Sequence, residues 1–109
     1  MLETLLGSKT RERVLQYILA REEGYAKEIA DFYGTSLDPV QKQLERLEQG
    51  GILASRRVGR TRLYRFNPRY AFREELKALL EKAREYYPEE MQEALMVYRK
   101  RARRKGKPL

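Results

Sequence analysis

The stretch of sequence that decides the fold covers residues 26–68 and reads AKEIADFYGTSLDPVQKQLERLEQGGILASRRVGRTRLYRFNP. In its first half the apolar residues recur at every third or fourth position, and Gly34 interrupts them. This spacing is typical of helices that bury one face, and a glycine commonly ends such a helix. The pattern therefore predicts two short helices, over residues 26–33 and 36–49, joined by a tight turn.

The second half of the same stretch has a different period. After Gly50-Gly51 the apolar residues alternate with polar ones, which predicts two strands over residues 52–58 and 61–66. Gly59-Arg60 fits the two-residue turn of a hairpin, and Asn67-Pro68 closes the second strand. Helix, turn, helix and hairpin therefore follow one another without a linker.

Further helices are predicted on both sides of this stretch. They cover residues 2–6, Lys9 to about Arg21, about 71–86, and residues from Pro88 onward. Ser8 is expected to cap the second of these helices and Gly24 to end it. The expected fold class is mainly α with a small β-hairpin. Residues 1–87 are expected to form the main domain, and residues 88–109 a C-terminal helix and basic tail.

Composition and charge exclude several classes of function. The 109 residues include 24 Lys and Arg against 16 Asp and Glu, which gives a net charge of +8. The chain has no Cys and no His, so disulfides, thiolate chemistry, Cys/His metal sites and imidazole catalysis are excluded. No paired acid site or phosphate loop stands out, so we expect neither an enzyme nor a cofactor. The apolar runs are too short to span a membrane, and a cytoplasmic prokaryotic protein is expected.

Most of the net charge belongs to one segment, the basic tail formed by residues 99–107. It contains seven basic side chains and no acidic one, so subtracting it leaves a charge of +1 for residues 1–98. A block of this kind attracts polyanions, although a solvated terminus would have the same composition. The basic tail alone therefore identifies no function.

The predicted helix over residues 36–49 turns a polar face outward. That face carries Asp38, Gln41, Lys42, Gln43, Glu45 and Arg46. The start of the helix has two interpretations: either Ser36 caps it, or Asp38 caps it and the next residue, a proline, takes the first helical position. A helix with such a face has about the width of the major groove of DNA, roughly 12 Å.

The predicted hairpin carries a cluster of arginines. Arg56, Arg57, Arg60 and Arg62 stand around Gly59. Guanidinium groups bind phosphates and are attracted into a narrow minor groove, but they also protect sheet edges against aggregation. A helix-turn-helix followed directly by a hairpin is the element order of a winged helix-turn-helix, which is the fold we predict.

On these residues the sequence resembles the ArsR-like winged-helix regulators. The segments that carry the resemblance are 5–11, 28–30, Gly34, 40–53 and 64–68. A similar subgroup is formed by prokaryotic winged-helix domains found ahead of minimal nucleotidyltransferase domains. The resemblance covers about residues 5–68 and implies DNA binding. Two departures limit it: Asp38 replaces a small neutral residue, and the absence of Cys removes the metal-sensing site.

The resemblance and the outward face together give a set of candidate DNA-binding residues. They are Ser36, Asp38, Gln41, Lys42 and Arg46 on helix 36–49, and Arg60, Thr61 and Arg62 in wing 56–62. Asp38 could instead be a cap, and Lys42 and Arg46 could pair with Glu45 and Glu48 on a solvated face.

Homodimerisation is also expected, because family members dimerise through their first and last helices and the C-terminal helices are rich in apolar residues. These residues are Leu76, Leu79, Leu80, Met91, Leu95 and Tyr98. The predicted function is that of a sequence-specific regulator of transcription that binds double-stranded DNA, with a repressor as the expected type. The alternatives are a module that docks a separately encoded nucleotidyltransferase, and RNA binding.

Overall fold

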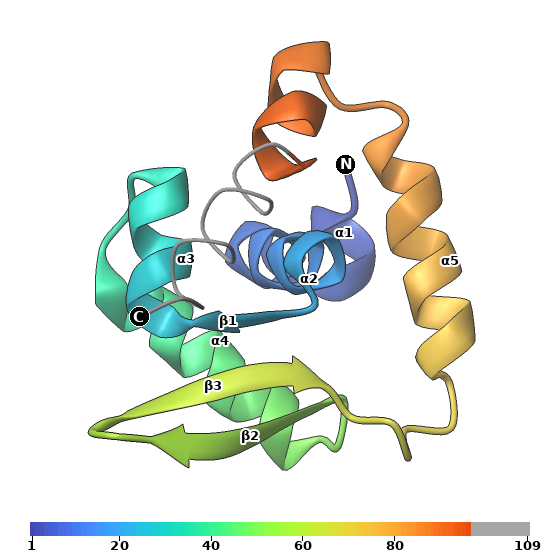
Figure 1. Ribbon diagram of the computed structural model, residues 1–109. Helices are drawn as coiled ribbons and strands as arrows, with labels where there is room; N and C mark the ends of the chain where they lie inside the picture. Colours follow the sequence, from blue (N-terminus) through green and yellow to red (C-terminus); the bar gives the residue numbers. More distant parts are fainter. Residues whose placement is uncertain (97–109) are drawn as a thin grey trace.

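A computed structural model describes residues 1–96 of the chain (Figure 1). Its elements are α1 Glu3–Leu6, α2 Lys9–Arg21, β1 Glu23–Tyr25, α3 Ala26–Tyr33, α4 Leu37–Gln49, β2 Leu53–Val58, β3 Thr61–Phe66 and α5 Arg73–Arg84. A further helix covers residues 89–96. The arrangement is a winged helix-turn-helix, as the element order predicts. Tyr98 and the basic tail lie outside the described residues.

The sheet has three strands, although the sequence pattern predicts only a two-stranded hairpin. The strand order is β1-β3-β2, and β3 pairs with both neighbours in antiparallel orientation. The additional strand, β1, places Gly24 opposite Tyr64. The expectation that Gly24 ends α2 is therefore wrong. The helix already ends at Arg21, and Glu22 follows with a left-handed φ of 73°. The hairpin turn is confirmed: Gly59, with a φ of 63°, suits a two-residue turn that a side chain would strain.

Gly24 also permits a close approach between β1 and α2. A Cβ atom at this position would lie 2.8 Å from Cε1 of Tyr17, a distance that real Cβ contacts do not reach. Gly24 is buried against this ring. The strand that precedes α3 is thus in tight contact with the central helix of the molecule.

The predicted helix boundaries are largely correct. Ser8 caps α2, accepting a hydrogen bond of 3.1 Å from the Arg11 amide, and α3 ends at Gly34. Ser36 occupies the N-cap position of α4 in extended conformation, but its side chain makes no capping hydrogen bond. Asp38 lies inside the first turn, so the interpretation of Asp38 as the cap is wrong.

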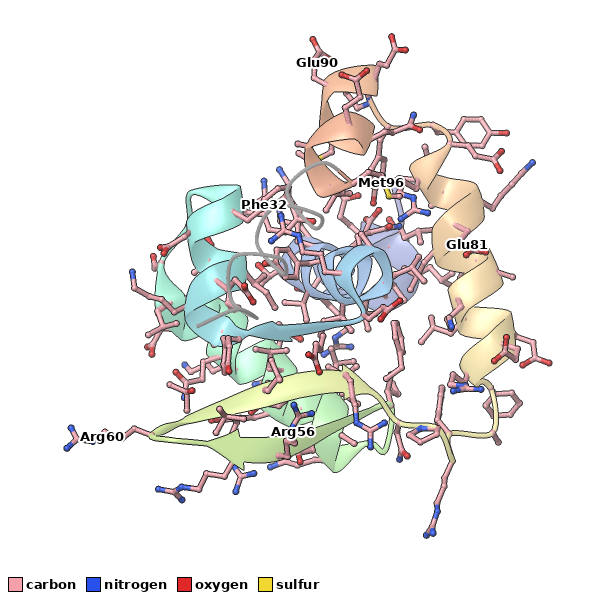
Figure 2. The ribbon with its side chains drawn as sticks, in the orientation of Figure 1. Phe32, Arg56, Arg60, Glu81, Glu90 and Met96 are labelled. Atoms are coloured by element: carbon pink, nitrogen blue, oxygen red, sulfur yellow. The ribbon has the colours of Figure 1, made fainter. Side chains whose placement is uncertain are left out.

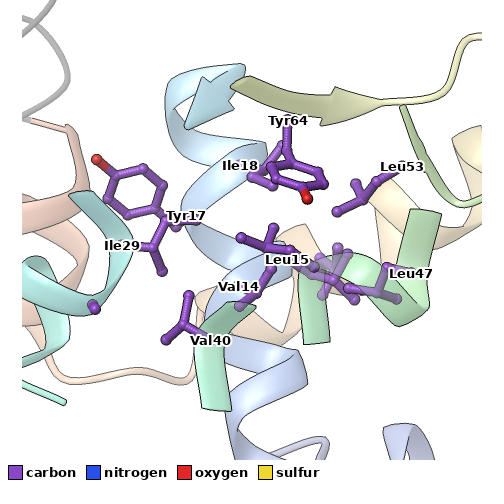
Figure 3. Close-up of a cluster of buried hydrophobic side chains, with 12 residues drawn as sticks. Val14, Leu15, Tyr17, Ile18, Ile29, Val40, Leu47, Leu53 and Tyr64 are labelled. Atoms are coloured by element: carbon purple, nitrogen blue, oxygen red, sulfur yellow. The ribbon is translucent and has the colours of Figure 1, made fainter. Parts of the chain in front are cut away.

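One apolar cluster joins the helices to the sheet (Figure 3). Its members are Val14, Leu15, Tyr17, Ile18, Ile29, Ala30, Val40, Leu44, Leu47, Leu53, Tyr64 and Leu80. The three from α4 repeat at intervals of four and three, which fixes one face of α4 against α2. Full burial of one such side chain contributes roughly 1.5–3 kcal/mol. Because the buried face of α4 is fixed in this way, the opposite face of α4 points to solvent.

The apolar residues of the C-terminal helices are partly used within the chain. Leu80 and Leu95 are fully buried, so they do not form the free apolar surplus that the sequence suggests. Leu76, Leu79 and Met91 are half-buried. Among residues 1–96, no helix has the length and apolarity needed to cross a bilayer.

Candidate nucleic-acid interface

The helix α4 exposes the side that the sequence predicts. Asp38, Gln41, Lys42 and Arg46 are all exposed, as is Ser36 just before the helix. Within residues 1–96, neither Lys42 nor Arg46 forms an ion pair, so the predicted pairing with acidic neighbours is not observed. The outer face of α4 therefore presents uncompensated polar and charged groups to solvent.

The hairpin register separates the wing arginines into two sets. Arg57 is directly opposite Arg62 on one face of the β2–β3 pair, while Arg56 is opposite Leu63 on the other. Arg56 has a partner there, since its Nη1 lies 3.5 Å from Oε1 of Glu23. Arg60 stands at the tip and projects away from the body (Figure 2). The wing thus presents Arg57, Arg60 and Arg62 together, but not Arg56.

A groove of about 420 Å³ lies between α4, the start of α3 and the wing. It is lined by Tyr25, Ala26, Lys27, Leu37, Gln41, Glu45, Arg57, Arg60, Thr61, Arg62 and Tyr64. Four of the predicted site residues, one from α4 and three from the wing, therefore share one groove. Ser36, Asp38, Lys42 and Arg46 do not line it and lie on the exposed surface beside it.

The groove contains basic residues that the sequence prediction did not include. Arg57 belongs to it because the two-residue turn sets Arg57 across from Arg62. The register that follows from this turn would have been enough to predict the pairing. Lys27 reaches it from α3 and lies 3.1 Å from Oδ1 of Asp31. Arg57, Arg60 and Arg62 form no ion pair in the part of the chain that the structure describes. The groove wall thus carries three guanidinium groups that are not ion-paired, together with one carboxylate, that of Glu45.

A chain of hydrogen bonds connects the wing to α4 behind this groove. The Ser55 hydroxyl donates to Oε2 of Glu48 over 2.8 Å, and Nη1 of Arg62 donates to the same hydroxyl oxygen over 3.2 Å. Tyr64 lies nearby, and burial raises the pKa of its hydroxyl, with the carboxylates of Glu48 and Glu45 adding to the shift. Tyr64 is therefore a neutral group at physiological pH.

A second polar cluster surrounds the buried carboxylate of Glu12. The buried carboxylate of Glu12 accepts hydrogen bonds from the Leu2 amide, at 2.8 Å, and from the Tyr87 hydroxyl. It thereby holds two chain segments together. Among the described residues, no group of three or more Asp or Glu could hold a metal ion.

Comparison with solved structures finds the same fold in other proteins. Reduced HlyU from Vibrio cholerae has 20% identity and a TM-score of 0.59, with 79% of this chain and 84% of HlyU covered. A ZitR variant from Lactococcus lactis has 17% identity and a TM-score of 0.50, with coverage of 92% and 75%. At these identities the likeness shows the fold.

A third structure is closer in sequence. The 1–100 fragment of Mb0332 from Mycobacterium bovis has 26% identity and a TM-score of 0.58, with 82% of this chain and 80% of the fragment covered. It is described as a homodimeric winged helix-turn-helix DNA-binding domain of a possible ArsR-family transcriptional regulator. No protein-family model and no curated protein matches the chain. The description of the Mb0332 fragment is thus that of a regulator and not of an enzyme.

Proposed function

We propose that this protein is a transcriptional regulator that binds double-stranded DNA through α4 and the wing. The observation that carries the proposal is the groove wall of Arg57, Arg60 and Arg62 beside the exposed polar face of α4, three guanidinium groups that form no ion pair within residues 1–96. The three guanidinium charges outnumber the one carboxylate of the groove, that of Glu45, and they repel each other. Anions that bind between them relieve this repulsion, and a phosphate backbone supplies such anions at regular spacing.

The two parts of the surface have different roles in this proposal. The exposed residues of α4 reach base edges in the major groove, where amide and basic side chains distinguish base pairs. The wing residues bind the phosphates that flank the major groove. The proposed base-reading set is Ser36, Asp38, Gln41, Lys42 and Arg46, and the proposed backbone-binding set is Arg60, Thr61 and Arg62. We add Arg57 and Lys27 to the second set because they line the same groove.

Salt dependence tests the proposal directly. Fluorescence anisotropy with a labelled duplex measures affinity at several salt concentrations. If about six phosphates are neutralised, affinity falls roughly a thousandfold between 50 and 200 mM salt. Absence of binding to any duplex at low salt would contradict the proposal, and so would binding that does not respond to salt.

We further propose that the protein binds as a homodimer. The support comes from the homodimeric Mb0332 fragment and from apolar side chains that remain exposed: Leu5, Phe72 and Tyr86 have exposed fractions of 67%, 62% and 64%. Two-fold symmetry would set the two α4 helices about one DNA turn apart, roughly 34 Å. Sedimentation equilibrium distinguishes a dimer from a 13.0 kDa monomer.

Repression and sequence specificity belong to the same proposal. Selection of bound fragments from genomic DNA identifies the preferred sequence, and a promoter assay with that sequence distinguishes repression from activation. The alternatives are outcomes of the same measurements. Preference for duplex RNA in a competition assay would favour RNA binding, and failure to bind any nucleic acid would favour docking to a separately encoded nucleotidyltransferase.

A further inference from the structure

Ser55 is the point at which the two parts of the interface meet. Its half-buried side chain lies on β2, donates to Oε2 of Glu48 on α4 and accepts from Nη1 of Arg62 on β3. A hydroxyl has one donor hydrogen and two acceptor lone pairs, so it makes both bonds at once. A single oxygen atom therefore connects α4 to both strands of the wing.

Without a hydrogen bond such as the one to Ser55, two effects would leave the Arg62 side chain poorly ordered. It stands directly opposite Arg57, and like charges in opposite positions of a strand pair repel each other. Arginine also has many rotamers, and those lost on binding reduce the affinity. The bond to Ser55 counteracts both effects, because it holds the Arg62 guanidinium before any ligand arrives.

The intervening hydroxyl also preserves the charge of Arg62. Within residues 1–96, Arg62 makes no direct ion pair with Glu48 and no further hydrogen bond from its guanidinium nitrogens. A direct ion pair with Glu48 would compensate the positive charge of the Arg62 guanidinium and weaken its attraction for a phosphate. The hydroxyl instead engages Nη1 and leaves the remaining donors for a phosphate oxygen.

We propose that Ser55 is a positioning residue for DNA binding, whose hydroxyl, itself anchored on Glu48, holds Arg62 in place to bind a backbone phosphate. The inference rests on the proposed DNA-binding function and adds the device that aligns the wing with α4. Ser55 acts through Arg62 and needs no DNA contact of its own.

A set of variants of the full chain tests the proposal: Ser55→Ala, Ser55→Thr, Arg62→Ala and the double variant Ser55→Ala/Arg62→Ala. Threonine keeps the hydroxyl and favours strands, so it is the matched control. In duplex anisotropy we expect Ser55→Ala to weaken binding about fivefold, which corresponds to the net contribution of one ordinary hydrogen bond. Ser55→Thr should bind within about twofold of the unsubstituted protein, and Ser55→Ala should have no further effect once Arg62 is absent.

A second measurement separates positioning from folding and does not require DNA. Relaxation of the ¹⁵Nε–Hε group of Arg62 in the free protein should show an ordered side chain, which becomes mobile in Ser55→Ala and stays ordered in Ser55→Thr. Thermal unfolding confirms that each variant is folded. An Arg62 side chain that is equally mobile in all three proteins would overturn the proposal.

The two proposals fail in different ways. Equal affinity of Ser55→Ala and the unsubstituted protein would overturn the role of Ser55 but leave DNA binding intact. The same holds if Ser55→Ala weakens binding equally with and without Arg62. If the unsubstituted protein binds no duplex at low salt, the proposed function fails, and the positioning role falls with it.

Discussion

The helix α4 and the wing hairpin lie side by side in the fold but differ in charge. Within Leu37–Gln49 three carboxylates outnumber two cationic side chains, whereas Leu53–Phe66 carries five arginines and no acidic residue. Both segments expose charged residues to solvent. The proposed DNA-binding surface is therefore divided between a helix that is net negative and a hairpin that is strongly positive.

This difference in charge suggests that the wing and α4 have different roles in the proposed complex. In the proposed complex, attraction to phosphates is independent of sequence and would come from the wing. The carboxylates of α4 repel phosphates, yet a carboxylate can accept a hydrogen bond from the amino group of cytosine. A helix with this charge weakens binding to most sequences and favours those that offer a matching donor, which increases specificity.

Removing the wing charges should have the largest effect on binding. The triple variant Arg57→Ala/Arg60→Ala/Arg62→Ala should lose about a hundredfold in affinity at low salt, and the slope of log affinity against log salt should fall by about 2.7. Anisotropy titrations at several salt concentrations measure both quantities.

The control for the wing variant is Lys82→Ala on α5, which removes an exposed cation that does not line the groove. It should change the affinity by less than about twofold, as expected of a surface charge outside the contact. If the Lys82 variant and the wing variant lose affinity equally per charge removed, the assignment of phosphate binding to the wing is wrong.

A charge on α4 should affect sequence preference more than overall affinity. Lys42→Ala should weaken binding to the selected sequence about tenfold, the effect of losing one base contact, and weaken random duplex much less. Parallel titrations with the selected and a scrambled duplex give the ratio. A uniform loss on both would show that Lys42 binds phosphate, and the division between helix and wing would then be less sharp.

Removing a carboxylate from the groove should strengthen binding modestly. Glu45→Gln takes away one negative charge that lines the groove, and at a distance of several Å in water this gives roughly a threefold gain on all duplexes. Glu81→Gln is the matched control, because Glu81 is an exposed carboxylate on α5, away from the wing (Figure 2). Weaker binding of the Glu45 variant would indicate that this carboxylate accepts a hydrogen bond from DNA.

The smallest expected effect is that of pH. The wing charges are arginines, the chain has no histidine, and burial raises the pKa of Tyr64 above its usual value near 10. The proposed interface therefore lacks a histidine, the side chain that ordinarily titrates near neutral pH, and the pKa of Tyr64 is shifted away from that range. Anisotropy between about pH 6 and 9 should give a constant affinity. A step in affinity near neutral pH would show that a titrating group outside the proposed interface takes part in binding.

Much of the fold could be predicted because it depends on local patterns. The stripe of Val40, Leu44 and Leu47 and the turn at Gly59-Arg60 are visible in short windows of sequence, and the helices and hairpin strands follow from such patterns. The strand β1 is different. It has three residues, Glu23–Tyr25, and exists only because β3 pairs with it from about forty positions along the chain. A three-residue strand of this kind is too short to produce a periodic pattern in the sequence.

The candidate site was predictable to a similar extent. Exposure of Lys42 and Arg46 follows from the helical period, and the position of Arg60 follows from the turn. Arg57 could have been included as well, because the two-residue turn at Gly59-Arg60 sets it opposite Arg62. The link from Glu48 through Ser55 to Arg62 depends on how α4 lies against the sheet, which only the packed core determines.

In the proposed complex, the contact of Gly24 with Tyr17 would affect how the protein meets DNA. The strand β1 leads directly into α3 at Ala26, so its pairing with β3 and its contact with α2 fasten the helix pair to the wing. The distance between α4 and the hairpin is consequently set by the folded chain before binding. A duplex whose groove width does not match that distance has to bend or twist to reach both parts. Easily deformed sequences then gain an advantage that no base contact accounts for.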